Sequence, residues 1–228
     1  MERLFILIAR INSVLFLLIL LCAAGSIALM TLGSNRWQRR GAVEVHETES
    51  GLQKQILLSF EKIESIAGAN TQMMRLTTQD KSGKLSSGGY GNETRNILFL
   101  VGTEKTARWL FKDHKHHILD ASQLKEGLGN SKERPTTALY FEYVTEDTNG
   151  DGRLSSADDS HIGLAKPDGT GFLEVLHDAS RVFSYKLLDQ RHLSVVYQKG
   201  STVRHTKFSL ASMKPEADQE IINVPSTL

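Results

Sequence analysis

Four oxygen-bearing side chains are spaced along one short acidic stretch, residues 147–158, in a pattern that suits a cation. They stand at positions one, three, five and twelve of the stretch and are Asp147, Asn149, Asp151 and Asp158. Calcium takes six to eight oxygen ligands in a flexible shell, and a short loop supplies them only when alternate side chains point inward. The spacing therefore predicts a calcium-binding loop.

Three further residues of this loop fit the same geometry. Gly152, at position six, permits a sharp turn that a residue with a Cβ would resist. Arg153, at position seven, would offer its backbone carbonyl, and Ser155, at position nine, could hold a water molecule. With Ca2+ as the cofactor, we expect the metal ligands to be Asp147, Asn149, Asp151, Arg153 and Asp158.

The pattern Asp-x-Asn-x-Asp-Gly, closed by Asp at position twelve, resembles the EF-hand calcium loop and more closely its dockerin variant. Asp159, the residue after the loop, departs from the EF-hand habit of an apolar residue there. An EF-hand also needs a helix on each side, whereas residues 137–144 and 160–165 have the composition of strands. A calcium loop between two strands resembles the insertions in blades of TolB-type β-propellers. That resemblance implies an ion that pins a connection between strands.

Three histidines, His114, His116 and His117, fall within five residues. On a strand, His114 and His116 would share one face and could hold a transition metal, and the alternative is a polar hairpin tip. The sequence contains no G-x-S-x-G elbow, no C-x-x-C, no H-E-x-x-H and no phosphate-cradling Gly-Lys-Ser/Thr run. It therefore predicts no catalytic residues and a protein that is not an enzyme.

Residues 11–32 contain no charged side chain and are rich in Leu, Ile, Val, Ala and Phe. A helix of this length would span roughly 30 Å, enough to cross a bilayer. A cleaved signal peptide is the alternative, but the apolar sequence continues past the small residues at 23–25 as far as Leu32. We expect an uncleaved, single-pass signal anchor that follows a short N-terminal segment, residues 1–10.

The basic residues on the two sides of this segment are nearly balanced, so the positive-inside rule does not decide its orientation. The calcium loop favours a body outside the cytoplasm, where calcium is far more available. Five of the 27 basic and one of the 26 acidic side chains precede residue 41, so the body is slightly acidic, unlike a nucleic-acid-binding domain. We expect an inner (cell) membrane protein with a periplasmic C-terminal domain.

The remainder of the chain alternates short β-type runs with polar turns. After a linker at residues 33–50, strand–turn–strand units recur through residues 51–212, with one turn at residues 167–169. Residues 213–228 contain two of the four prolines and are expected to be a flexible tail. The predicted fold is mostly β: one transmembrane helix, then an antiparallel β-meander domain that is a partial propeller or a sandwich, since it is too short for a complete propeller.

These features predict a non-catalytic, membrane-anchored, calcium-binding accessory or scaffold protein that presents its β domain to a protein partner. The chain resembles a bacterial envelope protein with TolB-like repeats. Two alternatives are a calcium-responsive sensor of a membrane complex and a metal-dependent enzyme that uses the histidines at 114, 116 and 117. If the ion is structural, we expect calcium-dependent melting with little change in shape. A sensor should change its surface when calcium binds, and an enzyme should have a concave pocket around the histidines.

Overall fold

A computed structural model describes residues 42–47, 54–79, 93–125 and 134–224. The chain divides into two compact units, residues 1–43 and 44–228, and nearly all of the described residues belong to the second. In the part that the structure describes, all regular secondary structure is β-strand. The prediction of a mostly β fold is confirmed.

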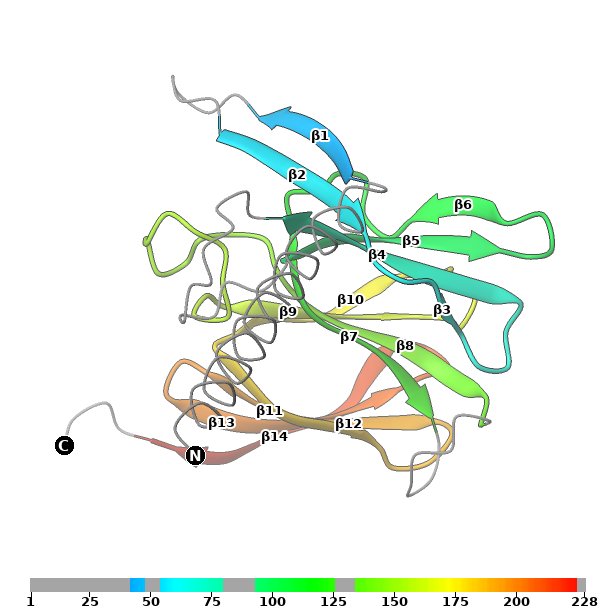
Figure 1. Ribbon diagram of the computed structural model, residues 1–228. Coiled ribbons are helices and arrows are strands. Elements are labelled where there is room, and N and C mark those ends of the chain that lie inside the picture. The colour runs from blue at the N-terminus through cyan, green and yellow to red at the C-terminus, as the bar shows by residue number, and fades with distance from the viewer. Residues whose placement is uncertain (1–41, 48–53, 80–92, 126–133, 225–228) are drawn as a thin grey trace, which may run out of the picture. The chain divides into compact units, whose positions relative to one another are not determined.

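The larger sheet follows the order of the chain. Its main path runs through β1 (Ala42–Glu47), β2 (Lys54–Phe60), β4 (Thr71–Gln79), β5 (Thr94–Val101), β7 (His117–Lys125), β8 (Thr136–Val144), β9 (Ser160–Ala165) and β10 (Leu173–Ala179). Two short strands lie off this path, β3 (Glu64–Ser65) beside β4 and β6 (Thr106–Trp109) beside β5. From β2 to β10 the neighbours pair antiparallel, as predicted for a meander (Figure 1).

A second sheet of four strands follows, also in chain order. It consists of β11 (Arg181–Leu187), β12 (His192–Lys199), β13 (Thr202–Ser209) and β14 (Lys214–Asn223). All three pairings are antiparallel. Both sheets have free edges, so neither closes into a barrel.

Strand β8 is buried on both of its faces, which explains its nearly continuous apolar sequence. Successive side chains of a strand point to opposite faces. Leu139, Phe141 and Tyr143 therefore face one core cluster, whereas Ala138 and Tyr140 face another. A strand that contributes to two cores cannot show the simple alternation of a half-buried strand.

The two core clusters lie on opposite faces of the larger sheet. The first joins β8 to β4, β5 and β7 through residues such as Met73, Phe99 and Ile118. The second joins β8, β9 and β10 to Leu193 and Phe208 of the smaller sheet, so the two sheets pack against each other there. Tyr140 stacks on Tyr185 of β11 across this contact, with ring centroids 3.8 Å apart.

The predicted turn between β9 and β10 is confirmed. The amide of Gly169 donates to the carbonyl of Lys166 at 2.7 Å, and Gly169 has a positive φ of 73°. A Cβ at this position would stand 2.8 Å from the ring of Phe99, so glycine suits both the backbone and the packing. Asp168 accepts hydrogen bonds from the amide and hydroxyl of Thr170, which hold the turn.

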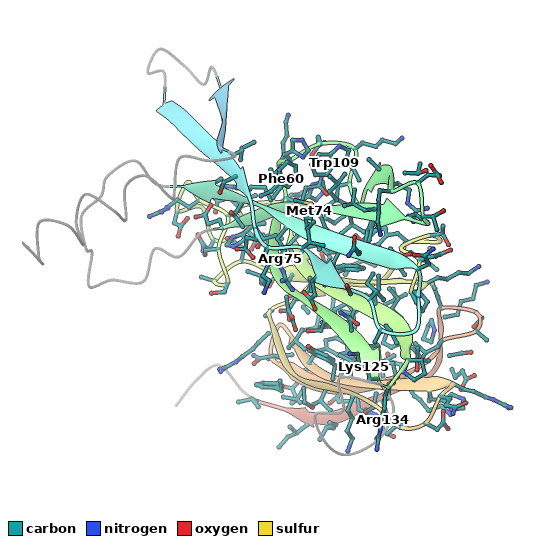
Figure 2. The ribbon with its side chains drawn as sticks, turned by 45° about the vertical axis from the view of Figure 1, so that its right-hand side comes forward. Phe60, Met74, Arg75, Trp109, Lys125 and Arg134 are labelled. Atoms are coloured by element: carbon teal, nitrogen blue, oxygen red, sulfur yellow. The ribbon has the colours of Figure 1, made fainter. Side chains whose placement is uncertain are left out.

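An apolar strip lies on the face of β4 and β5 opposite the first core. The register places Met74 opposite Leu98, and Leu98 opposite Trp109 of β6. Phe60 of β2 stacks on Trp109 with ring centroids 6.0 Å apart, and both rings are 37% exposed (Figure 2). This half-exposed strip of Phe60, Met74, Leu98 and Trp109 is a surface on which another apolar group could rest.

The prediction of a flexible tail does not hold for residues 214–223, which form β14. All ten residues of this strand are exposed, so the segment lacks the apolar alternation that marks a strand in sequence. Backbone pairing with β13 holds it, helped by Asp218, which accepts from Arg204 at 2.6 Å and from Thr206 at 2.7 Å. The β domain therefore extends beyond the predicted boundary at residue 212.

The predicted N-terminal segment at 1–10 and anchor at 11–32 lie outside the described residues, as do most of the predicted linker at 33–50 and the last four residues. Within the described ranges, no helix is long and apolar enough to span a membrane.

Candidate metal centres

The acidic loop connects β8 to β9, in the position that the sequence predicts. The side chain of Asp147 is surrounded by three backbone amides: Oδ1 accepts from Gly150 at 2.7 Å and from Asp151 at 3.1 Å, and Oδ2 accepts from Gly152 at 2.7 Å. Gly150 and Gly152 have φ values of 74° and 80°, which glycine adopts without strain. The first half of the loop is thus wound around the carboxylate at position one.

The side chains at positions three and five continue this winding. Asn149 Oδ1 accepts from the amide of Asp151 at 2.9 Å, and Asp151 Oδ1 accepts from the amide of Arg153 at 2.9 Å. Each side chain uses one lone pair in this way, and a carboxylate or amide oxygen retains another for a cation. Asp147, Asn149 and Asp151 are exposed, so an ion has access to all three side chains.

Asp158, at position twelve, behaves differently because it is 2% exposed. Its Oδ1 accepts from the amides of Thr148 at 2.9 Å and Asn149 at 3.1 Å, and its Oδ2 accepts from the amide of Ser155 at 2.8 Å. Burial raises the pKa of Asp158, but these backbone hydrogen bonds outweigh burial and hold the pKa below its usual value. Asp158 is therefore the ionised hub that joins the two ends of the loop.

Two contacts attach the loop to the sheet. His117, the first residue of β7, donates from Nδ1 to the carbonyl of Leu154 at 2.8 Å. The amide of Asp159 donates to Thr148 Oγ1 at 2.8 Å, just before β9 begins. The conformation of the loop is thus linked to β7 and to the start of β9.

The three predicted histidines do not form a metal cluster. His114 and His116 precede β7 in an irregular segment, and each imidazole has its own environment. Asn96 donates from Nδ2 to His114 Nδ1 at 2.9 Å, and His116 stacks on Phe111 with ring centroids 3.9 Å apart. Burial lowers the pKa of His116. The prediction that His114 and His116 share the face of a strand is wrong, because β7 begins only at His117.

A different set of residues comes together at the edge of the larger sheet. His161 of β9 and Glu174 and His177 of β10 have ligand atoms that all lie within 4.8 Å of one another. His161 Nδ1 lies 3.5 Å from Glu174 Oε1, and His177 Nδ1 contacts the same oxygen. In the described ranges, no other three His, Cys, Asp or Glu side chains bring their ligand atoms this close together, and the loop carboxylates lie farther apart.

Irregular pairing of β10 places these side chains on one face. In a regular strand, residues three apart point to opposite faces, so Glu174 and His177 would diverge. The register shifts between Glu174 and Leu176, which are two residues apart on β10 but pair with the adjacent residues Gly163 and Ile162 of β9. This extra residue in β10 turns Leu176 into the second core and brings His177 to the side of Glu174, as bulges commonly do.

The histidine–glutamate cluster is supported by Tyr143 on β8. The Tyr143 hydroxyl donates to Glu174 Oε2, and its ring stacks on His161 with centroids 5.6 Å apart. Burial raises the pKa of Tyr143, and the hydrogen bond to Glu174 raises it further, so the phenol stays protonated. The sequence contained no local signal for this cluster, since its members are 13 and 3 residues apart and meet only through pairing and a bulge.

No family model matches the chain, and no curated protein matches it. A solved structure of a luciferin-regenerating enzyme is similar to the chain with a TM-score of 0.35 and 9% identity, over 72% of this chain. The chain spans 60% of the length of that structure. At this level the similarity carries no argument about fold or activity.

The prediction that the chain is not an enzyme is withdrawn: the structure found by this comparison is named as an enzyme, and the prediction had no positive observation behind it. The prediction rested on the absence of contiguous catalytic motifs. That reasoning is insufficient in a β fold, where side chains distant in sequence converge across strands, as His161 and Glu174 do.

Proposed function

We propose that this chain is a membrane-anchored calcium-binding protein whose ion is held by the β8–β9 loop. The side chains of Asp147, Asn149 and Asp151, the carbonyl of Arg153 and the carboxylate of Asp158 are the proposed ligands. The observation that carries the proposal is the winding of the loop amides around Asp147, Asn149 and Asp151. These bonds hold the three side chains in place, which lowers the cost of ordering them around an ion.

Asp158 is compatible with this role. Its Oδ2 accepts the amide of Ser155 at 2.8 Å and the Ser155 hydroxyl at the longer distance of 3.4 Å. A carboxylate oxygen has about two lone pairs and the hydroxyl can rotate, so a cation can share this oxygen. The carboxylates of residues 147, 151 and 158 lie farther apart than the ligand atoms of His161, Glu174 and His177. We therefore expect calcium to draw the loop carboxylates together. In this proposal the ion pins the connection between β8 and β9.

We also propose that the two packed sheets form a sandwich-like or partial propeller-like domain. Residues 11–32 would anchor it in the membrane, with the domain on the extracytoplasmic side. The protein would act as an accessory or scaffold subunit that presents this domain to a protein partner. The half-exposed strip of Phe60, Met74, Leu98 and Trp109 supports this role, because a sheet face with two stacked, exposed aromatic rings suits an apolar contact.

Thermal unfolding of the full chain in detergent, with calcium or with a chelator, tests the proposed ion site. Calcium at 100 times its dissociation constant should stabilise the folded chain by about 2.7 kcal/mol. Asp147→Ala combined with Asp151→Ala should abolish this difference between the two conditions, because it removes two of the ligands.

The matched control is Glu146→Ala combined with Asp159→Ala, which removes two carboxylates that flank the proposed ligands. This control should keep the calcium-dependent shift. A wild-type chain that is folded in both conditions and melts at the same temperature would contradict the proposal.

A further inference from the structure

The histidine–glutamate cluster of His161, Glu174 and His177 has features that an ordinary surface ion pair does not need. His161 is largely buried, with 18% of its side chain exposed. Its Nδ1 is buried and has no hydrogen-bond partner in the described part of the chain, and it lies 3.5 Å from Glu174 Oε1. A buried nitrogen without a partner costs free energy unless something else satisfies it.

The other ring nitrogen of His161 explains which nitrogen is free. His161 Nε2 lies 3.2 Å from Oγ1 of Thr145, the residue that follows β8. When Nε2–H donates to this hydroxyl, Nδ1 carries the lone pair and points at Glu174. Metal-binding histidines characteristically donate their second ring N–H in this way, which fixes both the tautomer and the orientation of the ring.

Glu174 is oriented by a second group of the same kind. The Tyr143 hydroxyl donates to Oε2, so Oε1 faces the two histidines. Zinc binds nitrogen and carboxylate ligands at about 2.0–2.2 Å, which in a tetrahedral shell places ligand atoms roughly 3.4 Å apart. The 3.5 Å between His161 Nδ1 and Glu174 Oε1 matches this spacing, whereas His177 Nδ1 lies closer to the same oxygen and would move away from it to share an ion.

We propose that His161, Glu174 and His177 form a binding site for a divalent transition metal, with zinc as the ion that best fits two imidazoles and one carboxylate. Calcium does not fit, because it takes oxygen ligands. The site is therefore separate from the acidic loop in both residues and ion. Glu174 and His177 are 31% and 61% exposed, so the ion would keep an open position toward solvent.

The open position determines what the site can do. Three protein ligands with a free fourth position are the arrangement of zinc sites that bind water or a substrate oxygen, whereas structural zinc sites use four protein ligands. The bound ion would act as a Lewis acid toward an oxygen ligand in the fourth position. Tyr143 and Thr145 would be positioning residues, since each acts through a ligand.

Titration of zinc into the metal-free full chain, in competition with a chromogenic chelator and with excess calcium present, tests this site. We expect the cluster in the wild-type chain to bind one zinc ion per chain. His177→Ala should fold normally, because the imidazole is mostly exposed. Losing a residue that hydrogen-bonds to a metal ligand typically weakens metal binding by about 10- to 100-fold. Because His177→Ala removes a ligand itself, it should weaken zinc binding by more than that.

Tyr143→Phe provides a graded test, since it keeps the ring and removes only the donor to Glu174. It should weaken zinc binding by about 10- to 100-fold. Cobalt in place of zinc should give a visible absorption band in the wild-type chain and not in His177→Ala, because the band reports a nitrogen-ligated, low-coordinate ion.

His192→Ala is the matched control, because His192 also contacts two carboxylates, Asp189 at 2.8 Å and Glu216 at 3.2 Å, but lies on β12. Zinc binding should be unchanged in this control and in Asp147→Ala with Asp151→Ala. Equal zinc affinity in the wild-type chain and His177→Ala would overturn the proposal. Zinc binding that is lost in Asp147→Ala with Asp151→Ala but kept in His177→Ala would also overturn it.

Discussion

Replacing Phe141 by alanine is expected to lower the free energy of unfolding by about 3–5 kcal/mol, the usual cost of deleting a buried aromatic side chain. Phe141 is 1% exposed and lies on β8, whose pairing partners are β7 and β9. Its ring contacts Phe172, which lies just before β10, with centroids 6.0 Å apart. Removing the ring would leave a cavity beside β8 and β9, the two strands that the acidic loop connects.

Urea unfolding of the full chain, followed by tyrosine and tryptophan fluorescence, measures this loss. Phe183→Ala is the matched control, because Phe183 lies on β11 and is 47% exposed. The control should change the free energy of unfolding by less than about 1 kcal/mol. A loss for Phe141→Ala as small as that of the control would show that β8 is not central to the core.

Replacing Asp158 by alanine is expected to cost about 3 kcal/mol and to abolish calcium binding. Each hydrogen bond to a charged group contributes about 1.5–3 kcal/mol, and Asp158 accepts three from backbone amides. The sum is reduced because Thr148 and Asn149 are exposed, so water can reach their amides in the variant. Asp159→Ala, which removes the neighbouring carboxylate, should have little effect on either property.

The contribution of Asp158 should depend on pH with a definite sign. Its pKa in the folded chain is lowered, because backbone hydrogen bonds outweigh the effect of burial. The stabilisation is therefore fully present above the unfolded pKa of about 3.9 and is lost as the pH falls through the lower folded value. Chelator-treated wild type should lose more stability between about pH 5 and pH 2 than Asp158→Ala does. Equal acid dependence would contradict the role of Asp158 as an ionised hub.

The sequence predicted those parts of the fold that depend on local patterns. Strand β9 and the turn at Gly169 follow from apolar runs and turn residues, and the acidic loop follows from twelve contiguous residues. The strand at 214–223 could not be predicted in this way, because none of its side chains is buried and its order comes from pairing with β13.

The predicted histidines and the histidines that do come together differ for the same reason. His114 and His116 are close in sequence, but hydrogen bonding to Asn96 and stacking on Phe111 direct them to different partners. His161 and His177 are 16 residues apart and meet because β9 and β10 pair with a register shift. A bulge depends on how two strands pack, so a single sequence does not reveal which side chains it reorients.

The two proposed sites are close along the chain, since Asp158 closes the loop three residues before His161 begins the other cluster. Asp159 and Thr148 join the loop to the start of β9, and Thr145 contacts His161 from the end of β8. The two sites therefore adjoin the same ends of β8 and β9, but no proposed ligand of one ion is a ligand of the other.

Calorimetric titration of calcium into the chelator-treated full chain tests the central proposal most directly. We predict one calcium ion per chain in the wild type, no binding in Asp147→Ala with Asp151→Ala, and unchanged binding in His177→Ala. Calcium binding that is absent from the folded wild type, or equally strong in the double loop variant, would contradict the account.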